Sequence, residues 1–311
     1  MKKKIFIDGK AGTTGLRIYE RLSEREDIEL ITLKEEDRKN TDCRKAAINC
    51  ADVAFLCLPD AAAIEAVGLV ENENTVIIDT STAHRTNADW TYGFPEIDEK
   101  LANAIPNAKR VAVPGCHASG FIALVKPLID AGIIGKETLL TCHSITGYSG
   151  GGKQMIAEYE DYEVDALYCA PRQYALGQTH KHLKEMKAVT GLENEPIFCP
   201  IVSDFYSGMV VTVPLFASQL NDGKTAEDIK KVYAAKYVGE LVKYSPSIDE
   251  NGMISAAGMS LSDAMQVTVA GNDDRILLIA RYDNLGKGAS GAAVQCLNLI
   301  IGANQTDGLE I

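Results

Sequence analysis

The sequence predicts an α/β protein, with a Rossmann-type doubly wound parallel sheet and an α+β domain that has a mixed or antiparallel sheet. Three observations predict this fold class. Short apolar runs alternate with segments of helical spacing over residues 4–125, which is typical of a parallel sheet with helices on both faces. A glycine-rich turn directly follows the first apolar run, at residue 9. From residue 138 onward, β-rich runs predominate, which favours a second sheet.

Bulk composition is that of an ordinary globular chain of one large or two medium domains. The 311 residues are 46% hydrophobic and 24% charged. A net charge of −12 argues against nucleic acid and anionic membranes as partners. No apolar run reaches membrane-spanning length, and the lysines at positions 2–4 precede no signal-peptide core. The eight cysteines show neither CxxC pairs nor metal-ligand spacing, so we expect a reduced, cytoplasmic protein without a metal site.

The first candidate site is the turn Gly9-Lys10-Ala11-Gly12-Thr13-Thr14-Gly15. It follows a predicted strand over residues 4–7 and precedes a segment of helical spacing that begins at Leu16. Strand, glycine turn and helix form the unit that receives a dinucleotide pyrophosphate on amide groups at a helix N-terminus. The spacing is GxxGxxG rather than GxGxxG, so the position after the first strand carries the prediction. We expect the cofactor to contact Gly9, Gly12, Thr13, Thr14 and Gly15.

The end of the second predicted strand, over residues 29–33, bears on the choice between NAD and NADP. An acidic residue at this point would bind the ribose 2′-hydroxyl of NAD. Here Lys34 comes first, and Arg38 follows after three acidic residues. The two cations could accommodate the 2′-phosphate of NADP, although a solvated charged loop is an alternative. We predict NADP(H), bound by Lys34 and Arg38.

Further candidates follow the strand predicted over residues 76–79. In a doubly wound sheet, ligands bind beyond the carboxyl ends of the strands. Ser81 is therefore expected to contact the cofactor. Arg85 is the preferred partner for a substrate phosphate or carboxylate, because a guanidinium binds such groups in a bidentate manner.

Cys116 lies where a β-branched run passes into a predicted helix, directly after Pro114-Gly115. Unpaired amides and the helix dipole at such a position favour negative charge, and hence the reactive thiolate. The alternative is a small buried residue at a strand–helix corner. We expect Pro127 to kink this helix or end it early, because proline in a helix interior costs about 3 kcal/mol.

Residues 177–191 form the second informative stretch, with Thr179 as the expected N-cap of a helix that Gly191 closes. On a helix, His180 and His182 would point about 200° apart, so only one could face a given thiol. The dipole disfavours a charged histidine at the N-terminus, which suits a neutral general base. On a strand the two could bind metal, but a third ligand is missing. A surface histidine pair is the other alternative.

The remaining histidines are weaker candidates. His117 adjoins Cys116, but neighbouring residues rarely face each other on a helix. His84 and His143 flank predicted strand ends, where structural roles are common. The glycine-rich segment over residues 147–153 could wrap an anionic substrate with its amides or serve as a hinge.

The second domain is expected to contain several strands and to be followed by a returning apolar helix that ends at Ile301. We predict a cofactor domain over residues 1–115 and 286–311 and a second domain over residues 116–285. The predicted strands of the second domain cover residues 138–146, 198–202, 209–216, 266–270 and 276–282.

Five blocks, in order over nearly the whole chain, resemble the aldehyde-forming, phosphate-releasing reductases, which include aspartate-semialdehyde dehydrogenase. The chain resembles most closely the short form of the N-acetyl-gamma-glutamyl-phosphate reductase family. It departs from the longer form in that Val113, His117 and Ser119 replace Asn, Tyr and Thr around the cysteine. The blocks are Gly9 to Leu16, Tyr92-Gly93-Phe94-Pro95-Glu96, Val113-Pro114-Gly115-Cys116, His180-Lys181-His182 with Glu185, and Lys287-Gly288-Ala289-Ser290-Gly291.

This resemblance implies an enzyme of arginine biosynthesis that uses NADPH to convert N-acetyl-gamma-glutamyl phosphate to N-acetylglutamate 5-semialdehyde. It implies Cys116 as the nucleophile that forms a thioester, and His180 as its acid/base partner. It also implies a homo-oligomer, dimer or tetramer, with residues 116–285 as the catalytic and dimerisation domain. Alternatives are a related reductase of another acyl phosphate, an oxidative aldehyde dehydrogenase, and a non-catalytic NADP-binding sensor. The implied substrate-pocket residues are Tyr174, His182 and Glu185, and the closing loop brings Gly288 to the cofactor.

Overall fold

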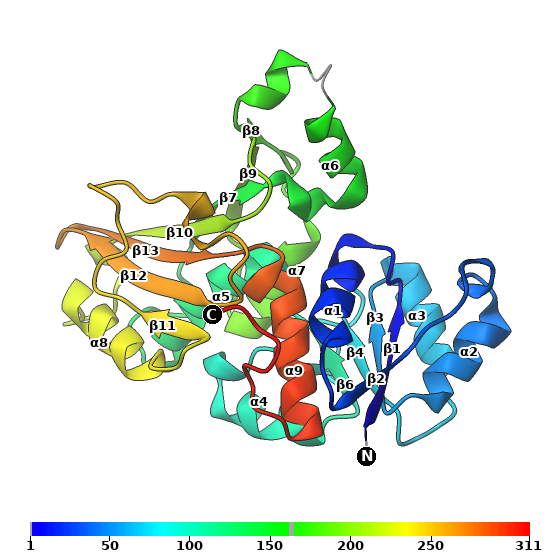
Figure 1. The fold of residues 1–311 in the computed structure, drawn as a ribbon. Helices are drawn as coiled ribbons and strands as arrows, with labels where there is room; N and C mark the ends of the chain where they lie inside the picture. Colours follow the sequence, from blue (N-terminus) through cyan, green and yellow to red (C-terminus); the bar gives the residue numbers. More distant parts are fainter. Residues whose placement is uncertain (1, 162–164) are drawn as a thin grey trace. The chain divides into compact units, whose positions relative to one another are not determined.

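The computed structural model describes residues 2–161 and 165–311, and the chain divides into two compact units (Figure 1). Unit 1 comprises Met1–Pro114 and Ala289–Leu309. Unit 2 comprises Gly115–Gly288 and Glu310–Ile311. The chain therefore leaves unit 1 directly before Cys116 and returns to it for a last helix.

Unit 1 is built on a six-stranded sheet in the order β2-β1-β3-β4-β6-β5, and each pair of neighbours is parallel. This arrangement confirms the predicted doubly wound sheet. Each strand is a short run rich in apolar residues, as expected where both faces of a sheet are covered. The strands are β1 (Lys3–Asp8), β2 (Ile28–Ile31), β3 (Val53–Leu56), β4 (Val76–Asp79), β5 (Thr91–Tyr92) and β6 (Arg110–Ala112).

Helices cover both faces of this sheet because successive strand residues point to opposite sides. Ile5 and Ile7 pack in one core with α1 and α9, whereas Phe6 packs in another with α2 and α3. Figure 1 shows α1 and α9 on one side of β1, and α2 and α3 on the other. The helical elements are α1 (Thr13–Ser23), η1 (Glu35–Asp37), α2 (Thr41–Cys50), α3 (Asp60–Gly68), η2 (Pro95–Ile97), α4 (Glu99–Ala104), η3 (Ile105–Asn107) and α9 (Gly291–Ile301).

Unit 2 is built on a seven-stranded mixed sheet in the order β11-β12-β13-β10-β7-β9-β8. The long strands coincide closely with the five predicted ones. The short strands β8 and β11 were not predicted, because two or three residues are too few to show a period of two. The strands are β7 (Thr141–Gly147), β8 (Arg172–Gln173), β9 (Ile197–Ser203), β10 (Met209–Phe216), β11 (Val242–Tyr244), β12 (Met265–Gly271) and β13 (Arg275–Tyr282).

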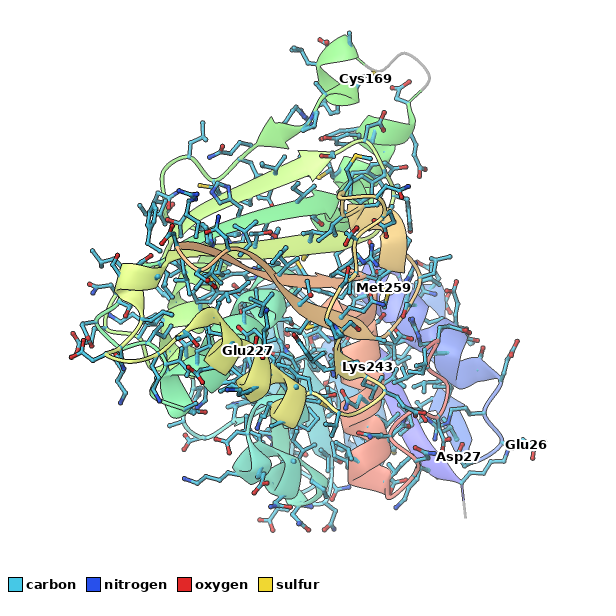
Figure 2. All side chains as sticks on the ribbon, turned by 90° about the vertical axis from the view of Figure 1, so that its left-hand side faces the viewer. Glu26, Asp27, Cys169, Glu227, Lys243 and Met259 are labelled. Atoms are coloured by element: carbon cyan, nitrogen blue, oxygen red, sulfur yellow. The ribbon has the colours of Figure 1, made fainter. Side chains whose placement is uncertain are left out.

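Helix α5 is the central helix of unit 2, and it packs against β10, β13, α7 and α8. Figure 2 shows Glu227 on α8, which lies beside edge strand β11, and it shows Cys169 at the tip of the extension that follows β7. The helical elements are α5 (Cys116–Asp130), η4 (Tyr148–Gly151), α6 (Gly152–Glu160), η5 (Ala166–Cys169), α7 (Lys181–Thr190), η6 (Ala217–Gln219), α8 (Ala226–Lys236), η7 (Ala256–Met259) and the π-helical turn η8 (Gly286–Ser290).

The helix does not end early at Pro127, as α5 continues through it to Asp130, so that part of the expectation is wrong, whereas the kink stays a prediction. Proline has no amide hydrogen, so residue 127 cannot bond the carbonyl of Ala123 four residues earlier. The Tyr237 hydroxyl donates a hydrogen bond to that carbonyl at 2.6 Å instead. Tyr237, at the C-terminal end of α8, thus replaces the hydrogen bond to the Ala123 carbonyl that proline cannot make.

Candidate active site

The glycine turn has the geometry of an anion-binding loop. Gly9 has φ +86°, and a Cβ there would lie 2.2 Å from the Cys57 carbonyl oxygen. Helix α1 begins after Gly12, which has no side chain to cap the first amides. Thr13 Oγ1 is buried and makes no hydrogen bond within the described ranges. Uncapped amides and an unused hydroxyl fit a pyrophosphate at this helix N-terminus.

A cavity of about 450 Å³ lies beside this turn, at the carboxyl ends of β1 and β2. Arg38 and Lys39 line it, whereas Lys34 is absent from the described lining and takes the N-cap position of η1, where its side chain makes no capping hydrogen bond. Arg38 pairs with exposed Glu35 at 2.5 Å. Arg44 also lines the cavity. The structure thus brings Arg38 to the cavity with Lys39 and Arg44, two cations that the sequence analysis did not single out.

Ser81 and Arg85 both lie beyond the end of β4, where their side chains bond to neighbouring strand ends. The Ser81 hydroxyl donates to the Asp79 carboxylate at 2.7 Å. Arg85 donates from Nε to the Val113 carbonyl and from Nη2 to the Thr80 carbonyl, each at 2.9 Å. These bonds hold the carboxyl edge of the sheet together. The predicted cofactor contact of Ser81 and substrate contact of Arg85 stay predictions.

His84 has a structural environment, as expected from its position. Its Nδ1 lies 2.6 Å from the Asp79 carboxylate, and its ring stacks on Trp90 at 4.1 Å between centroids.

Cys116 is the first residue of α5, and its thiol is partly exposed; the N-cap residue before it is a glycine. The Gly115 amide donates to Glu185 Oε1 at 2.8 Å, so this buried carboxylate holds the backbone next to the thiol. Gly288 packs against Cys116, since a Cβ on Gly288 would be 3.0 Å from the Cys116 Cβ. Side chains and loops from α7 and η8 therefore fix the start of this helix.

His117 lies in a buried cluster, although sequence reasoning ranked it low. Its Nδ1 lies 2.6 Å from Ser144 Oγ, and its Nε2 lies 2.6 Å from the Tyr174 hydroxyl. Its ring centroid is 5.9 Å from that of His180 and 5.5 Å from that of His182. Neighbours along α5 do not decide the environment of His117, because the cluster is assembled by residues of α7 and of the segment around β8.

His180 and His182 also depart from expectation. Thr179 is not the N-cap: His180 is, and its Nδ1 accepts a hydrogen bond from the His182 amide at 3.3 Å. Because His180 has extended rather than helical dihedrals, the two rings are not 200° apart, and their centroids lie 4.7 Å from each other. Gly191 ends the helix with φ 80°, as predicted. Among the described residues, no group of three or more His, Cys, Asp or Glu side chains could hold a metal ion.

Tyr174 contacts the histidine cluster and interacts electrostatically with Cys116. Burial raises the pKa of its hydroxyl, and the negative charge of Cys116 raises it further. The phenol is therefore protonated at neutral pH and lies within electrostatic range of the Cys116 sulfur. Unit 2 thus gathers a helix-terminal thiol, three imidazoles and a phenol, which together suit nucleophilic catalysis with proton transfer.

The environment of His117 predicts an acid-sensitive fold. Burial, with a further contribution from the charge of His180, lowers the pKa of His117 from 6.5 to about 3. Below pH 6.5, His117 is protonated in the unfolded chain, whereas in the folded chain it stays neutral down to about pH 3. The stability that neutral His117 contributes is thus complete above pH 6.5 and is lost as pH falls, by up to about 1.4 kcal/mol per pH unit.

We expect His117→Asn to remove this part of the pH dependence, as measured by urea unfolding between pH 7 and pH 4.5. At pH 7 the variant has a lower free energy of unfolding than the parent. This difference in free energy becomes smaller as pH falls, because only the parent loses the contribution of neutral His117. His143→Asn, on the exposed side of β7, is the matched control and keeps the slope of the parent. The prediction would be contradicted if the free energy of unfolding fell with pH at the same rate in His117→Asn and in the parent.

Comparisons with known proteins agree with this architecture. The model described as "Semialdehyde dehydrogenase, NAD binding domain" matches residues 4–104. The model described as "Semialdehyde dehydrogenase, dimerisation domain" matches residues 116–284. The N-acetyl-gamma-glutamyl-phosphate reductase of Rhizobium meliloti is 46% identical over 310 residues, covering 97% of this chain and 100% of the relative. The chain belongs to the N-acetyl-gamma-glutamyl-phosphate reductase family.

A second relative gives the same family, and solved structures of low identity show the same fold. The reductase 2 of Nostoc is 44% identical, with 99% of each chain covered. Aspartate semialdehyde dehydrogenase II from Vibrio cholerae has the same fold, with a TM-score of 0.73 at 18% identity over 97% of this chain and 99% of that one. The aspartate semialdehyde dehydrogenase from Candida albicans, solved with NADP, has a TM-score of 0.62 at 16% identity over 97% and 99%.

Family membership makes the chain an oxidoreductase and confirms both the predicted family and the predicted fold. The match to a dinucleotide-binding domain confirms a nicotinamide cofactor, predicted above as NADP(H). Within residues 2–161 and 165–311, no helix is long and apolar enough to cross a membrane.

Proposed function

We propose that this reductase catalyses the NADPH-dependent reductive dephosphorylation of N-acetyl-gamma-glutamyl phosphate to N-acetylglutamate 5-semialdehyde, a step of arginine biosynthesis. One observation carries the proposal: the Cys116 thiol at a helix N-terminus interacts electrostatically with Tyr174, which lies beside His117 and His180, in a chain 44–46% identical to reductases of that name. We also propose a homo-oligomer, dimer or tetramer, which the match to a dimerisation domain supports. Free cysteines suit a reducing cytoplasm.

The residues of unit 1 fit the cofactor. The uncapped amides after Gly12 and the unused hydroxyl of Thr13 suit its pyrophosphate, and Arg38 and Lys39 suit a 2′-phosphate. When bound, NADPH supplies the hydride for reduction. Arg38 and Lys39 on the lining of this cavity, which also carries Asp8, Glu35 and Glu36, support NADPH over NADH.

Cys116 carries the covalent chemistry of the proposal. Its thiolate attacks the carbonyl carbon of the acyl phosphate, the C–O bond to phosphate breaks, and inorganic phosphate leaves. The resulting thioester is reduced to a thiohemiacetal, whose C–S bond then breaks to release the aldehyde and regenerate the thiolate. Splitting the reaction at a thioester replaces one difficult step by two easier ones.

His180 moves the proton in this sequence. Since its Nδ1 accepts the capping hydrogen bond from α7, the neutral ring carries its proton on Nε2. To act as the acid, the ring first takes up a second proton from solvent, because a neutral imidazole that lost its Nε2 proton would become an imidazolate. The imidazolium then gives its Nε2 proton to the oxygen that becomes the thiohemiacetal hydroxyl, and the resulting neutral ring takes that proton back when the C–S bond breaks. The helix N-terminus keeps the ring neutral between these transfers, because its dipole disfavours a cation. Tyr174 and His182 complete the pocket for the substrate.

The reaction is tested in reverse, by following NADPH formation from N-acetylglutamate 5-semialdehyde, NADP and phosphate. We expect turnover that requires phosphate and the N-acetyl group. Faster turnover of aspartate semialdehyde would favour a related reductase of another acyl phosphate. Cofactor binding without turnover of either aldehyde, and without substrate protection of Cys116 from alkylation, would favour a sensor.

The cofactor cavity yields a prediction about specificity. Arg38→Ala and Lys39→Ala are each expected to weaken NADPH binding by about tenfold and leave NADH binding unchanged, because a charge-assisted hydrogen bond to the 2′-phosphate is lost. Fluorescence titration with both cofactors measures this effect. Lys34→Ala is the comparison variant, since Lys34 does not line the cavity. A loss of NADPH binding confined to Lys34→Ala would place the 2′-phosphate at Lys34 and contradict this prediction.

A further inference from the structure

We propose that Tyr282 is a positioning residue for the Cys116 thiol, acting through a hydroxyl inserted into the first turn of α5. This inference rests on the proposed function, in which that thiol is the nucleophile. Tyr282 is the last residue of β13, and its side chain is fully buried. Its hydroxyl donates to the Cys116 carbonyl oxygen at 2.5 Å and accepts from the Gly120 amide at 3.0 Å.

The two backbone groups that this hydroxyl contacts are four residues apart, so they are hydrogen-bond partners in an ordinary α-helix. A side chain that inserts between these two groups links the first turn of the helix to the element that carries the side chain. Here that element is β13, an interior strand of the mixed sheet between β12 and β10. The backbone of the thiol residue is thereby fastened to the most extensively paired part of unit 2.

Gly120 provides the space for this contact. A Cβ at position 120 would lie 2.7 Å from the Tyr282 hydroxyl oxygen and 2.7 Å from Val211 Cγ2. Both distances are below any real Cβ contact, so only glycine lets the phenol reach the helix backbone. Glycine usually lowers helix stability by about 1 kcal/mol, and its use in this first turn is explained by the approach of Tyr282.

Tyr282 is suited to a fixed donor role. Burial raises the pKa of its hydroxyl, and the negative charge of Cys116 raises it further, so the phenol keeps its proton over the working pH range. Its proton offsets the partial negative charge of the Cys116 carbonyl oxygen, next to a sulfur that is charged at the start of each turnover. Removing the hydroxyl should therefore make the thiolate less favourable and the thiol less well oriented.

Tyr237 provides a matched control for a purely structural role. It is also buried, and its hydroxyl also donates to a carbonyl of α5, that of Ala123 at 2.6 Å. Ala123 lies about two turns beyond Cys116. Tyr237→Phe removes the same chemical group from the same helix at a distance from the thiol, so it reports what loss of a buried hydroxyl does to stability alone.

The experiment compares Tyr282→Phe with Tyr237→Phe by the pH dependence of Cys116 alkylation with iodoacetamide, followed by peptide mass spectrometry. For Tyr282→Phe we expect the midpoint to rise by about half a pH unit or more, and kcat to fall about tenfold with KM little changed. Tyr237→Phe should lower the unfolding temperature and keep the parental alkylation profile. Equal profiles for both variants and the parent would overturn the proposal.

A second variant keeps the test valid if Tyr282→Phe does not fold. A fluorotyrosine placed at position 282 keeps the packing and strengthens the hydroxyl donor, so the alkylation midpoint is expected to fall; an unchanged midpoint would overturn the proposal. Alkylation needs no substrate. If the parent enzyme fails to turn over the acetylated semialdehyde, the proposed function fails while the alkylation comparison still decides the role of Tyr282.

Discussion

Replacing Cys116 by alanine is expected to abolish turnover, lowering kcat by at least about 10⁴-fold, while NADPH binding stays at the parental value. The covalent route has no substitute nucleophile once the sulfur is gone, and losses of this size are typical when a nucleophile is removed. Binding persists because the glycine turn and the cavity beside it belong to unit 1. Steady-state assays and fluorescence titration of NADPH measure the two effects separately.

Cys169→Ala is the control for this prediction. Cys169 is an exposed free thiol on η5, at the tip of the extension seen in Figure 2, and its replacement should leave activity and binding unchanged. Activity of Cys116→Ala within tenfold of the parent would contradict the thioester mechanism.

His180→Asn is expected to lower kcat by about 10²- to 10³-fold with a normal unfolding temperature, because proton transfer is lost while the cap is kept. The choice of asparagine follows from the structure. His180 caps α7 through its ring nitrogen, and asparagine is among the best N-cap residues. An alanine variant would lose both the N-cap hydrogen bond of α7 and the group that transfers the proton, so the two effects could not be told apart. Steady-state kinetics and thermal unfolding separate the two.

His182→Asn is the matched comparison, since His182 lies in the same cluster and is the alternative acid/base. As a pocket residue, it should raise KM more than it lowers kcat. If His180→Asn retained activity within a few-fold while His182→Asn lost it, proton transfer would belong to His182.

Much of the fold and part of the site follow from local sequence patterns. The apolar run at residues 4–7, the glycine turn and the helical spacing after it are neighbours in sequence, so their geometry depends on short-range sterics and amphipathicity. The same holds for Cys116, whose place at a helix N-terminus follows from Pro114-Gly115 before it and the apolar spacing after it. Gly191 ended its helix as expected because the left-handed conformation is a property of the residue itself.

By itself, then, the sequence determined the order of strands and helices, the family, and a thiol at a helix start. Tertiary structure alone decided which distant side chains meet that helix: Tyr174 at His117, 57 residues away, and Tyr282 at Gly120, 162 residues away. It also decided that α5 passes through Pro127 and that His180 caps α7. The physical reason is that periodicity reports which face of an element is apolar, whereas hydrogen bonds between elements depend on how the folded sheet and helices pack.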